Sequence, residues 1–124
     1  MTAKKTPESE KTLERRLVKE IENRGGMALK YTSQYHRGIP DRIILMPFGR
    51  IYFVELKSTG EKPNYIQRYA MRQLQERGFA AWVVDDSKKL EQFLLTVDVD
   101  QGYFIGNIDG KRDIIDVKRK ENSI

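Results

Sequence analysis

Residues 38–57 read GIPDRIILMPFGRIYFVELK, and this stretch decides the fold because two apolar runs are separated by turn residues. The runs are IILM at 43–46 and IYFV at 51–54, and Pro47-Phe48-Gly49 lies between them. Short apolar runs on either side of a turn of three to five residues are typical of a β-hairpin. The stretch therefore predicts strands at 42–46 and 50–57.

The register of this hairpin follows from its turn. With Phe48 at the centre of the turn, antiparallel pairing places Asp41 opposite Glu55 and Ile43 opposite Phe53. Directly paired residues share a face of the sheet, and Lys57 returns to that face because side chains alternate along a strand. Two carboxylates and an amine are therefore expected together at the open end of the hairpin.

This group of side chains suits the hydrolysis of a phosphodiester. Adjacent carboxylates repel each other, and a divalent cation neutralises both. Such a cation polarises a phosphoryl oxygen and lowers the pKa of a bound water. Asp41 and Glu55 would supply oxygen ligands, the Leu56 carbonyl would supply another, and Lys57 would orient the attacking water. Glu14, on the apolar side of the first helix, is a further candidate ligand that can lean over the sheet.

The pattern acid-any-lysine is weak by itself. It occurs four times in the chain, at Glu55, Asp86, Asp109 and Asp116, and the last three are interpreted as a helix cap, a turn and an edge strand. The Glu55 copy differs because Pro40-Asp41 lies across the hairpin from it and an apolar run precedes it. A hairpin with ordinary surface charges is the alternative that these residues leave open.

The composition limits the rest of the molecule. At 124 residues the chain suits one domain, 1–124, with a core over about 8–95 and an extra hairpin or tail over 98–124. The absence of cysteine and a single histidine, His36, exclude thiolate and multi-histidine metal sites, so Mg²⁺ is expected, with Mn²⁺ able to substitute. A net charge of +5 favours a polyanionic partner such as DNA. No apolar run is long enough to span a membrane, and we expect a cytoplasmic protein.

The remaining elements are predicted from periodicity. A first helix is expected from an N-cap at Thr6 to Gly25-Gly26, with a strand over 27–32 after it. Beyond the hairpin, we predict a helix over 64–77, a strand over 80–84 and a helix over 87–95. The fold class is α/β, with a mixed sheet and the order α-β-β-β-α-β-α. Packing positions are assigned to Trp82, Ile66, Tyr69 and Leu74, and the turn of a C-terminal hairpin is assigned to Asp109-Gly110.

From position 38 to 78, the sequence GIPDRIILMPFGRIYFVELKSTGEKPNYIQRYAMRQLQERG resembles the VRR-NUC family, a branch of the PD-(D/E)XK nuclease superfamily. The resemblance runs from about Glu10 to about Ser87, and its parts are the acidic first helix, Gly25-Gly26, Lys30, the Gly-Ile-Pro-Asp segment, Glu55-Leu56-Lys57 and Gln67. It implies metal-dependent cleavage of DNA on a PD-(D/E)XK core. Asp41 and Glu55 would be metal ligands, Lys57 the catalytic lysine and Gln67 a supporting residue.

Two details qualify this resemblance. Glu10 and Glu14 are one helical turn apart and face the same way, and the spacing to Gly25-Gly26 favours Glu14 as the acid of the first helix. The family often places a serine as the helix cap where this chain has Asn64, which can also cap. Members without accessory domains resemble Holliday junction resolvases, which implies branched DNA as substrate. A homodimer is implied as well, because a two-fold symmetric junction requires two active sites.

The surroundings of the site suggest contacts with nucleic acid. Lys30, Arg37, Arg42, Arg68 and Arg72 are predicted to form a phosphate-binding rim, and an unpaired base can stack on Tyr31 or Tyr35. The chain is too short for a separate domain that reads base sequence, so we predict structure selectivity. The alternatives are a flap-type nuclease, an RNA or restriction-type enzyme, and a non-catalytic DNA-binding or assembly module. The complete set of catalytic residue types favours the enzyme.

Overall fold

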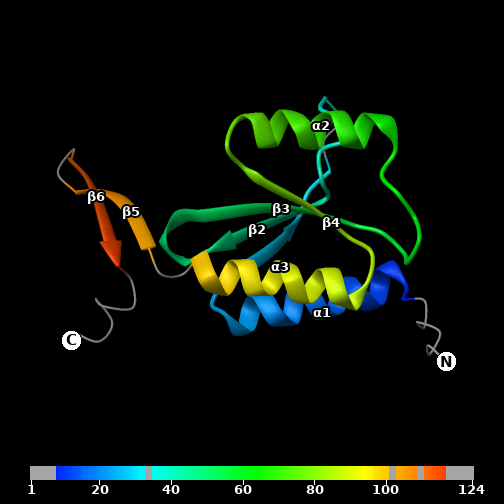
Figure 1. Ribbon diagram of the computed structural model, residues 1–124, viewed down its shortest axis with the longest axis horizontal. Helices are drawn as coiled ribbons and strands as arrows, with labels where there is room; N and C mark the ends of the chain where they lie inside the picture. The colour runs from blue at the N-terminus through cyan, green and yellow to red at the C-terminus, as the bar shows by residue number, and fades with distance from the viewer. Residues whose placement is uncertain (1–7, 33–34, 101–102, 109–110, 117–124) are drawn as a thin grey trace.

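The computed structural model describes residues 8–32, 35–100, 103–108 and 111–116, and its main body has three layers (Figure 1). A four-stranded sheet in the order β1-β2-β3-β4 lies in the middle, with α1 and α3 on one face and α2 on the other. In chain order, the elements are α1 (Glu10–Asn23), β1 (Met27–Lys30), β2 (Arg42–Met46), η1 (Pro47–Gly49), β3 (Arg50–Leu56), α2 (Tyr65–Glu76), β4 (Ala80–Val84), α3 (Ser87–Asp100), β5 (Tyr103–Ile108) and β6 (Lys111–Asp116). The predicted α/β class and the order α-β-β-β-α-β-α, which ends with α3, are confirmed.

The β2–β3 hairpin has the predicted register. Ile43 lies opposite Phe53 and Arg42 lies opposite Val54, so Asp41 and Glu55 form the next pair at the open end. The turn forms because Phe48 and Gly49 adopt left-handed φ values of 68° and 75°, a conformation that costs glycine nothing and that other residues adopt only in tight turns. The hairpin therefore brings the two acids together as expected.

The chain crosses from β3 to a parallel β4 through α2. This helix begins with Asn64 as N-cap, whose side chain accepts a hydrogen bond from the Gln67 backbone, and it ends before Gly78, which has a φ of 87°. Because β3 and β4 are parallel, with Glu55 opposite Val83, the crossover must pass over one face of the sheet. That face is the one on which Glu55 lies.

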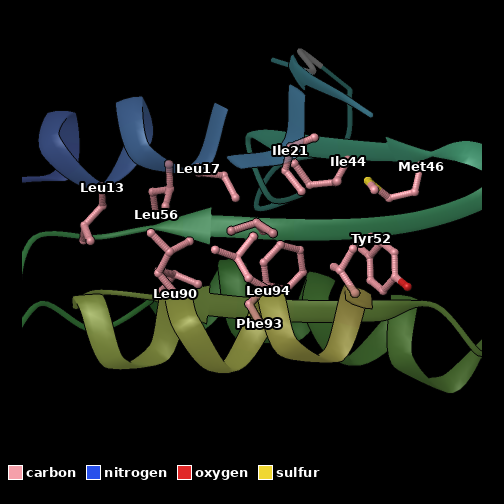
Figure 2. Close-up of a cluster of buried hydrophobic side chains, with 13 residues drawn as sticks. Leu13, Leu17, Ile21, Ile44, Met46, Tyr52, Leu56, Leu90, Phe93 and Leu94 are labelled. Carbon is pink, nitrogen blue, oxygen red and sulfur yellow. The ribbon is translucent and has the colours of Figure 1, made fainter. Parts of the chain in front are cut away.

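The hydrophobic core lies between the sheet and the α1–α3 layer (Figure 2). Fully buried side chains come from α1, from alternate positions of β2 and β3, and from α3. They include Leu13, Leu17, Ile21, Ile44, Val54, Leu90, Phe93 and Val97. Each one stabilises the fold by roughly 1.5–3 kcal/mol relative to an exposed position. Trp82 packs against this core with its ring centroid 5.6 Å from that of Phe93, in agreement with the packing role predicted for it.

Several predicted boundaries were wrong. Ser9, not Thr6, is the N-cap of α1, because its side chain accepts from the Thr12 backbone, and Thr6 itself lies outside the described residues. Strand β1 ends at Lys30 instead of 32, and α3 continues to Asp100 instead of 95.

Two packing positions predicted on α2 are exposed. Residues Ile66 and Tyr69, assigned to packing, are 45% and 53% exposed, because α2 instead buries Ala70 and Met71.

Strands β5 and β6 form a separate antiparallel pair in which Ile108 lies opposite Lys111. This agrees with the hairpin expected near the C-terminus, although its predicted turn, Asp109-Gly110, lies outside the described residues. Within the described part of the chain, no helix has the length and apolar character needed to cross a membrane.

Candidate active site

A cleft of about 450 Å³ opens where four segments of the chain meet. These segments are the first turn of α1, the loop that leads into β2, the end of β3 and the first turn of α2. The cleft is lined by Asp41, Glu55, Leu56, Lys57 and Gln67, along with residues of the surrounding loops. Five of the six residues predicted for catalysis or metal binding are therefore brought together, and the exception is Glu14.

The two acids at the floor of the cleft are held by the hairpin. Glu55 is only 6% exposed, and burial, together with the neighbouring charge of Asp41, raises its pKa to about 7 against the opposing effect of Lys57. One oxygen of Asp41, Oδ1, is buried and has no hydrogen-bond partner among the described residues. A buried carboxylate oxygen without a partner is costly, and a cation bound between the two acids would remove that cost.

Gln67 connects α2 to this acidic pair. Its Nε2 donates to Glu55 Oε1 at 2.8 Å, and its Oε1 accepts from the backbone N–H of Asn64 at 3.0 Å. The backbone N–H of Gln67 in turn donates to Asn64 Oδ1 at 2.9 Å, which completes a capping box. The amide therefore has one orientation, with only its NH₂ group directed at the acid. Gln67 and a cap at Asn64 were both predicted from the sequence, whereas their joint capping box was not, although the Asn-x-x-Gln spacing indicates one.

At the end of β3, the backbone sets the direction of the Leu56 carbonyl and of the Lys57 side chain. The Lys57 backbone N–H donates to Val84 O at 3.0 Å, towards β4. The Leu56 carbonyl belongs to the same trans peptide group as this N–H and points in the opposite direction, towards the β2 side, where Asp41 lies. The Lys57 side chain lines the cleft, and its ammonium makes no hydrogen bond or ion pair with the part of the chain that the structure describes. This ammonium is therefore available to a substrate or a water.

The acid contributed by α1 differs from the one that spacing favoured. Glu14 does not line the cleft, because its carboxylate binds the guanidinium of Arg42 on the opposite face of the sheet. Glu10, one helical turn earlier, lines the cleft instead. Among the described residues, no group of three or more acidic or histidine side chains is placed to hold a metal. The structure thus offers a pair of carboxylates and the Leu56 carbonyl.

The five predicted phosphate-binding residues lie in different parts of the structure, and Arg68 and Arg72 are exposed on α2. Arg37 lines the cleft, whereas Lys30 is exposed at the end of β1 and is not part of the lining. The DNA-binding role predicted for Arg42 is wrong, because its side chain is 8% exposed and is bound to Glu14 and to the carbonyl of Ala28. Arg42 follows Asp41 directly, so strand alternation turns it away from the cleft. Tyr31, named from the sequence as a possible stacking partner for a base, lies in the lining, as does His36.

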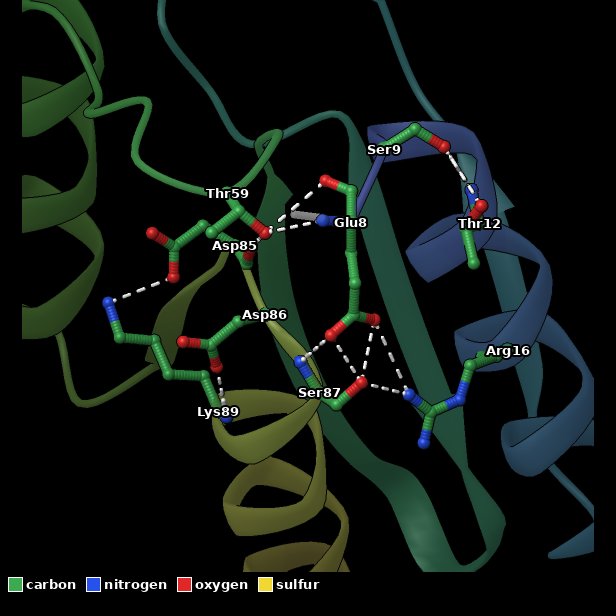
Figure 3. Close-up of polar contacts among 9 residues, drawn as sticks. All are labelled: Glu8, Ser9, Thr12, Arg16, Thr59, Asp85, Asp86, Ser87 and Lys89. Carbon is green, nitrogen blue, oxygen red and sulfur yellow. Dashed lines mark hydrogen bonds and ion pairs between the residues drawn. The ribbon is translucent and has the colours of Figure 1, made fainter. Parts of the chain in front are cut away.

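A polar network positions the start of α1 beside the cleft (Figure 3). The backbone N–H of Glu8 donates to Thr59 Oγ1 at 2.8 Å, and the Thr59 N–H donates to the Glu8 carbonyl at 3.0 Å. The Glu8 carboxylate accepts from the Ser87 backbone at 2.9 Å and from the Ser87 hydroxyl, and these bonds lower its pKa. The network joins α1, the loop after β3 and the first turn of α3, so Glu10 is held next to the end of β3, which Lys57 directly follows.

Comparisons with known proteins agree with this geometry. No family model matches the chain. A relative in Acyrthosiphon pisum secondary endosymbiont phage 1, named "Putative nuclease p44", is 40% identical over 88 residues, which cover 71% of this chain and 94% of the relative. A solved structure titled "VRR_NUC domain" has a TM-score of 0.66 at 24% identity, and the match covers 71% of this chain and 97% of that one. The chain therefore belongs to the same family as this phage relative, and its fold is that of a VRR_NUC domain.

Proposed function

We propose that the protein is a Mg²⁺-dependent DNA endonuclease that acts on branched DNA such as Holliday junctions. The observation that carries this proposal is the pair formed by Asp41 and Glu55, in which Asp41 Oδ1 is buried without a hydrogen bond among the described residues. The donors are two carboxylates and the Leu56 carbonyl, an all-oxygen set of the kind that Mg²⁺ takes, with Mn²⁺ able to replace it. When bound there, the ion supplies Lewis-acid polarisation of the phosphate and a more acidic water.

The residues of the cleft then have separate tasks. The Lys57 ammonium, which has no partner among the described residues, orients the attacking water and stabilises the charge that develops on the phosphate. Gln67 holds one oxygen of Glu55 in place, so that the carboxylate keeps a single orientation. Glu10 extends the acidic lining from the side of α1, and Arg37 neutralises phosphate charge at the rim.

The proposed substrate follows from charge. The net charge of +5 attracts a polyanion such as DNA. We include selection by DNA shape in the proposal. A junction with two-fold symmetry needs two cleavage sites, so we include a homodimer in the proposal.

The test is cleavage of labelled four-way junction, flap and linear duplex DNA with Mg²⁺, with Mn²⁺ and with chelator. We expect metal-dependent, paired nicks in the junction, lost in Glu55→Gln and in Lys57→Ala. Lys62→Ala, which removes an exposed lysine outside the cleft lining, is the matched control and should retain cleavage. Binding of junctions without cleavage in either metal would contradict the enzyme and favour a DNA-binding module. Cleavage of flaps alone would contradict the junction preference.

A further inference from the structure

The outer face of α2 carries an exposed stripe of two tyrosines and two arginines. Tyr65, Arg68, Tyr69 and Arg72 occupy positions i, i+3, i+4 and i+7 of the helix, which lie on one side. All four are exposed, and the two tyrosines are 72% and 53% exposed. The helix is the only one on its side of the four-stranded sheet among the described residues (Figure 1), so no described helix covers this stripe. We refer to these four residues as the α2 stripe.

The charge of the α2 stripe is not neutralised within the described part of the protein. The Arg72 side chain makes no hydrogen bond or ion pair with a described residue, and the Arg68 guanidinium donates only to the Pro63 carbonyl, at 2.7 Å. The only acid in α2 is Glu76, at its end. In the opposite layer, by contrast, α1 has equal numbers of acidic and basic residues and α3 has more acids than lysines. The α2 side therefore suits a negatively charged partner.

The α2 stripe is continuous with the cleft. Asn64, Ile66 and Gln67, in the first turn of the same helix, line the cleft. Gly38 packs directly on this turn, because a Cβ at position 38 would lie 2.4 Å from the Ile66 carbonyl oxygen, and its φ of 84° also excludes most side chains. This contact holds the loop that carries Arg37 beside the start of the helix. Tyr65, the first residue of the stripe, directly follows the cleft-lining cap residue Asn64, so the stripe begins at the edge of the cleft.

We infer that the α2 stripe binds an unpaired DNA strand as it leaves the cleft. Arginines bind phosphates and tyrosines stack on bases, which is the combination found in proteins that bind single strands. The two tyrosines are four residues apart, or about 6 Å along the helix axis, whereas bases stacked in a duplex strand are about 3.4 Å apart. The spacing therefore suits separated bases, whose faces are accessible only where a strand is unpaired. This inference rests on the proposed function and specifies which part of a branched substrate the protein holds.

The test is binding, measured without cleavage. Fluorescence anisotropy in chelator would compare labelled oligothymidine with a blunt duplex of equal length. We expect Tyr65→Ala/Tyr69→Ala to weaken binding of the single strand roughly ten-fold or more and binding of the duplex by less than about two-fold. Tyr65→Phe/Tyr69→Phe keeps both rings and should restore the affinity. The Arg68→Ala/Arg72→Ala variant should weaken binding of both DNAs and reduce the dependence of affinity on salt.

A matched control distinguishes an effect of the α2 stripe from a general effect of net charge on binding. Arg15→Ala/Lys19→Ala also removes two exposed positive charges four residues apart, but from α1 in the opposite layer, and should leave single-strand binding close to wild type. An equal loss in this control, or wild-type affinity in the tyrosine-to-alanine variant, would overturn the inference. Conversion of a dimer to a monomer by Tyr65→Ala/Tyr69→Ala, measured by light scattering, would assign the stripe to self-association instead. Because no cleavage is involved, these outcomes are independent of whether the protein is a Mg²⁺-dependent nuclease.

Discussion

Gln67 Nε2 lies 2.8 Å from Glu55 Oε1, and this hydrogen bond joins the first turn of α2 to the acidic floor of the cleft. The same amide accepts from the Asn64 backbone, so the cap that begins the helix also orients a proposed metal ligand. Local helix formation and the geometry of the site are therefore coupled through one side chain.

This coupling predicts the effect of removing the amide. Gln67→Leu should lower cleavage roughly 10- to 100-fold, as is typical when a residue behind a metal ligand is lost, and should raise the Mg²⁺ concentration required. Gln73→Leu is the control, because the Gln73 side chain bonds only to the exposed Arg77 of the same helix. Steady-state cleavage as a function of Mg²⁺ measures both effects. Unchanged Mg²⁺ dependence in Gln67→Leu would show that the hydrogen bond serves only the fold.

The acidic pair predicts a conflict between activity and stability. Glu55→Gln and Asp41→Asn should each lower cleavage roughly 100-fold or more. Glu55→Gln should nevertheless stabilise the metal-free protein by about 1–3 kcal/mol, because it removes a buried charge beside Asp41. Thermal unfolding in chelator and in Mg²⁺ measures the stability of each variant. Mg²⁺ should stabilise only the wild type against unfolding. Glu61→Gln removes an exposed acid and should change neither property. If Glu55→Gln were less stable than the wild type in chelator, repulsion between Glu55 and Asp41 would be contradicted.

The contrast between Glu10 and Glu14 gives opposite expectations for two residues of one helix. Glu14→Gln should destabilise the fold by about 1–3 kcal/mol, because Arg42 would be left buried without its carboxylate, and should leave the Mg²⁺ requirement unchanged. Glu10→Gln should raise the Mg²⁺ requirement with little effect on stability, because the residue is exposed at the cleft. Urea unfolding and Mg²⁺ titration of cleavage separate the two. The reverse pattern would restore Glu14 as the acid of the site.

Tyr52 predicts how stability changes in alkali. Burial and the hydrogen bond to Asp100 Oδ2, 2.6 Å long, raise the pKa of Tyr52 to about 12. Below the ordinary pKa of about 10, the phenol is neutral in both the folded and the unfolded chain, so its contribution is fully present. As pH rises from 10 towards 12, the unfolded chain ionises first, and stability falls by up to about 1.4 kcal/mol per pH unit.

Urea unfolding of wild type and Tyr52→Phe between pH 8 and pH 11 tests this. Phenylalanine does not ionise, so the advantage of the wild type at pH 8 should shrink as pH rises. Tyr65→Phe, at an exposed position, should follow the wild type throughout. A constant difference between wild type and Tyr52→Phe would show that Tyr52 titrates at its ordinary pKa.

Much of the candidate site could be predicted from local pattern. Apolar runs around Pro47-Phe48-Gly49 predicted the hairpin, and the turn then specified that Asp41 pairs with Glu55. Alternation along β3, continued by one residue, placed Lys57 on the same side as Glu55. The same rule applied to Arg42 would have shown that it faces away from Asp41, so that error was avoidable. These results depend only on bonding geometry between neighbouring strands, which is why residue order is sufficient for them.

The sequence by itself therefore determined the order of elements, the hairpin register and the pairing of the two acids. The tertiary structure decided that Glu10 and not Glu14 reaches the cleft, that Gln67 bonds Glu55, and that Tyr69 is exposed. Each of these depends on the position and rotation of a helix relative to the sheet. A helical repeat specifies which residues share a side of the helix, but packing against distant segments selects which side is buried. The buried side of a helix depends on many contacts with distant segments, and a single stretch of sequence does not specify those contacts.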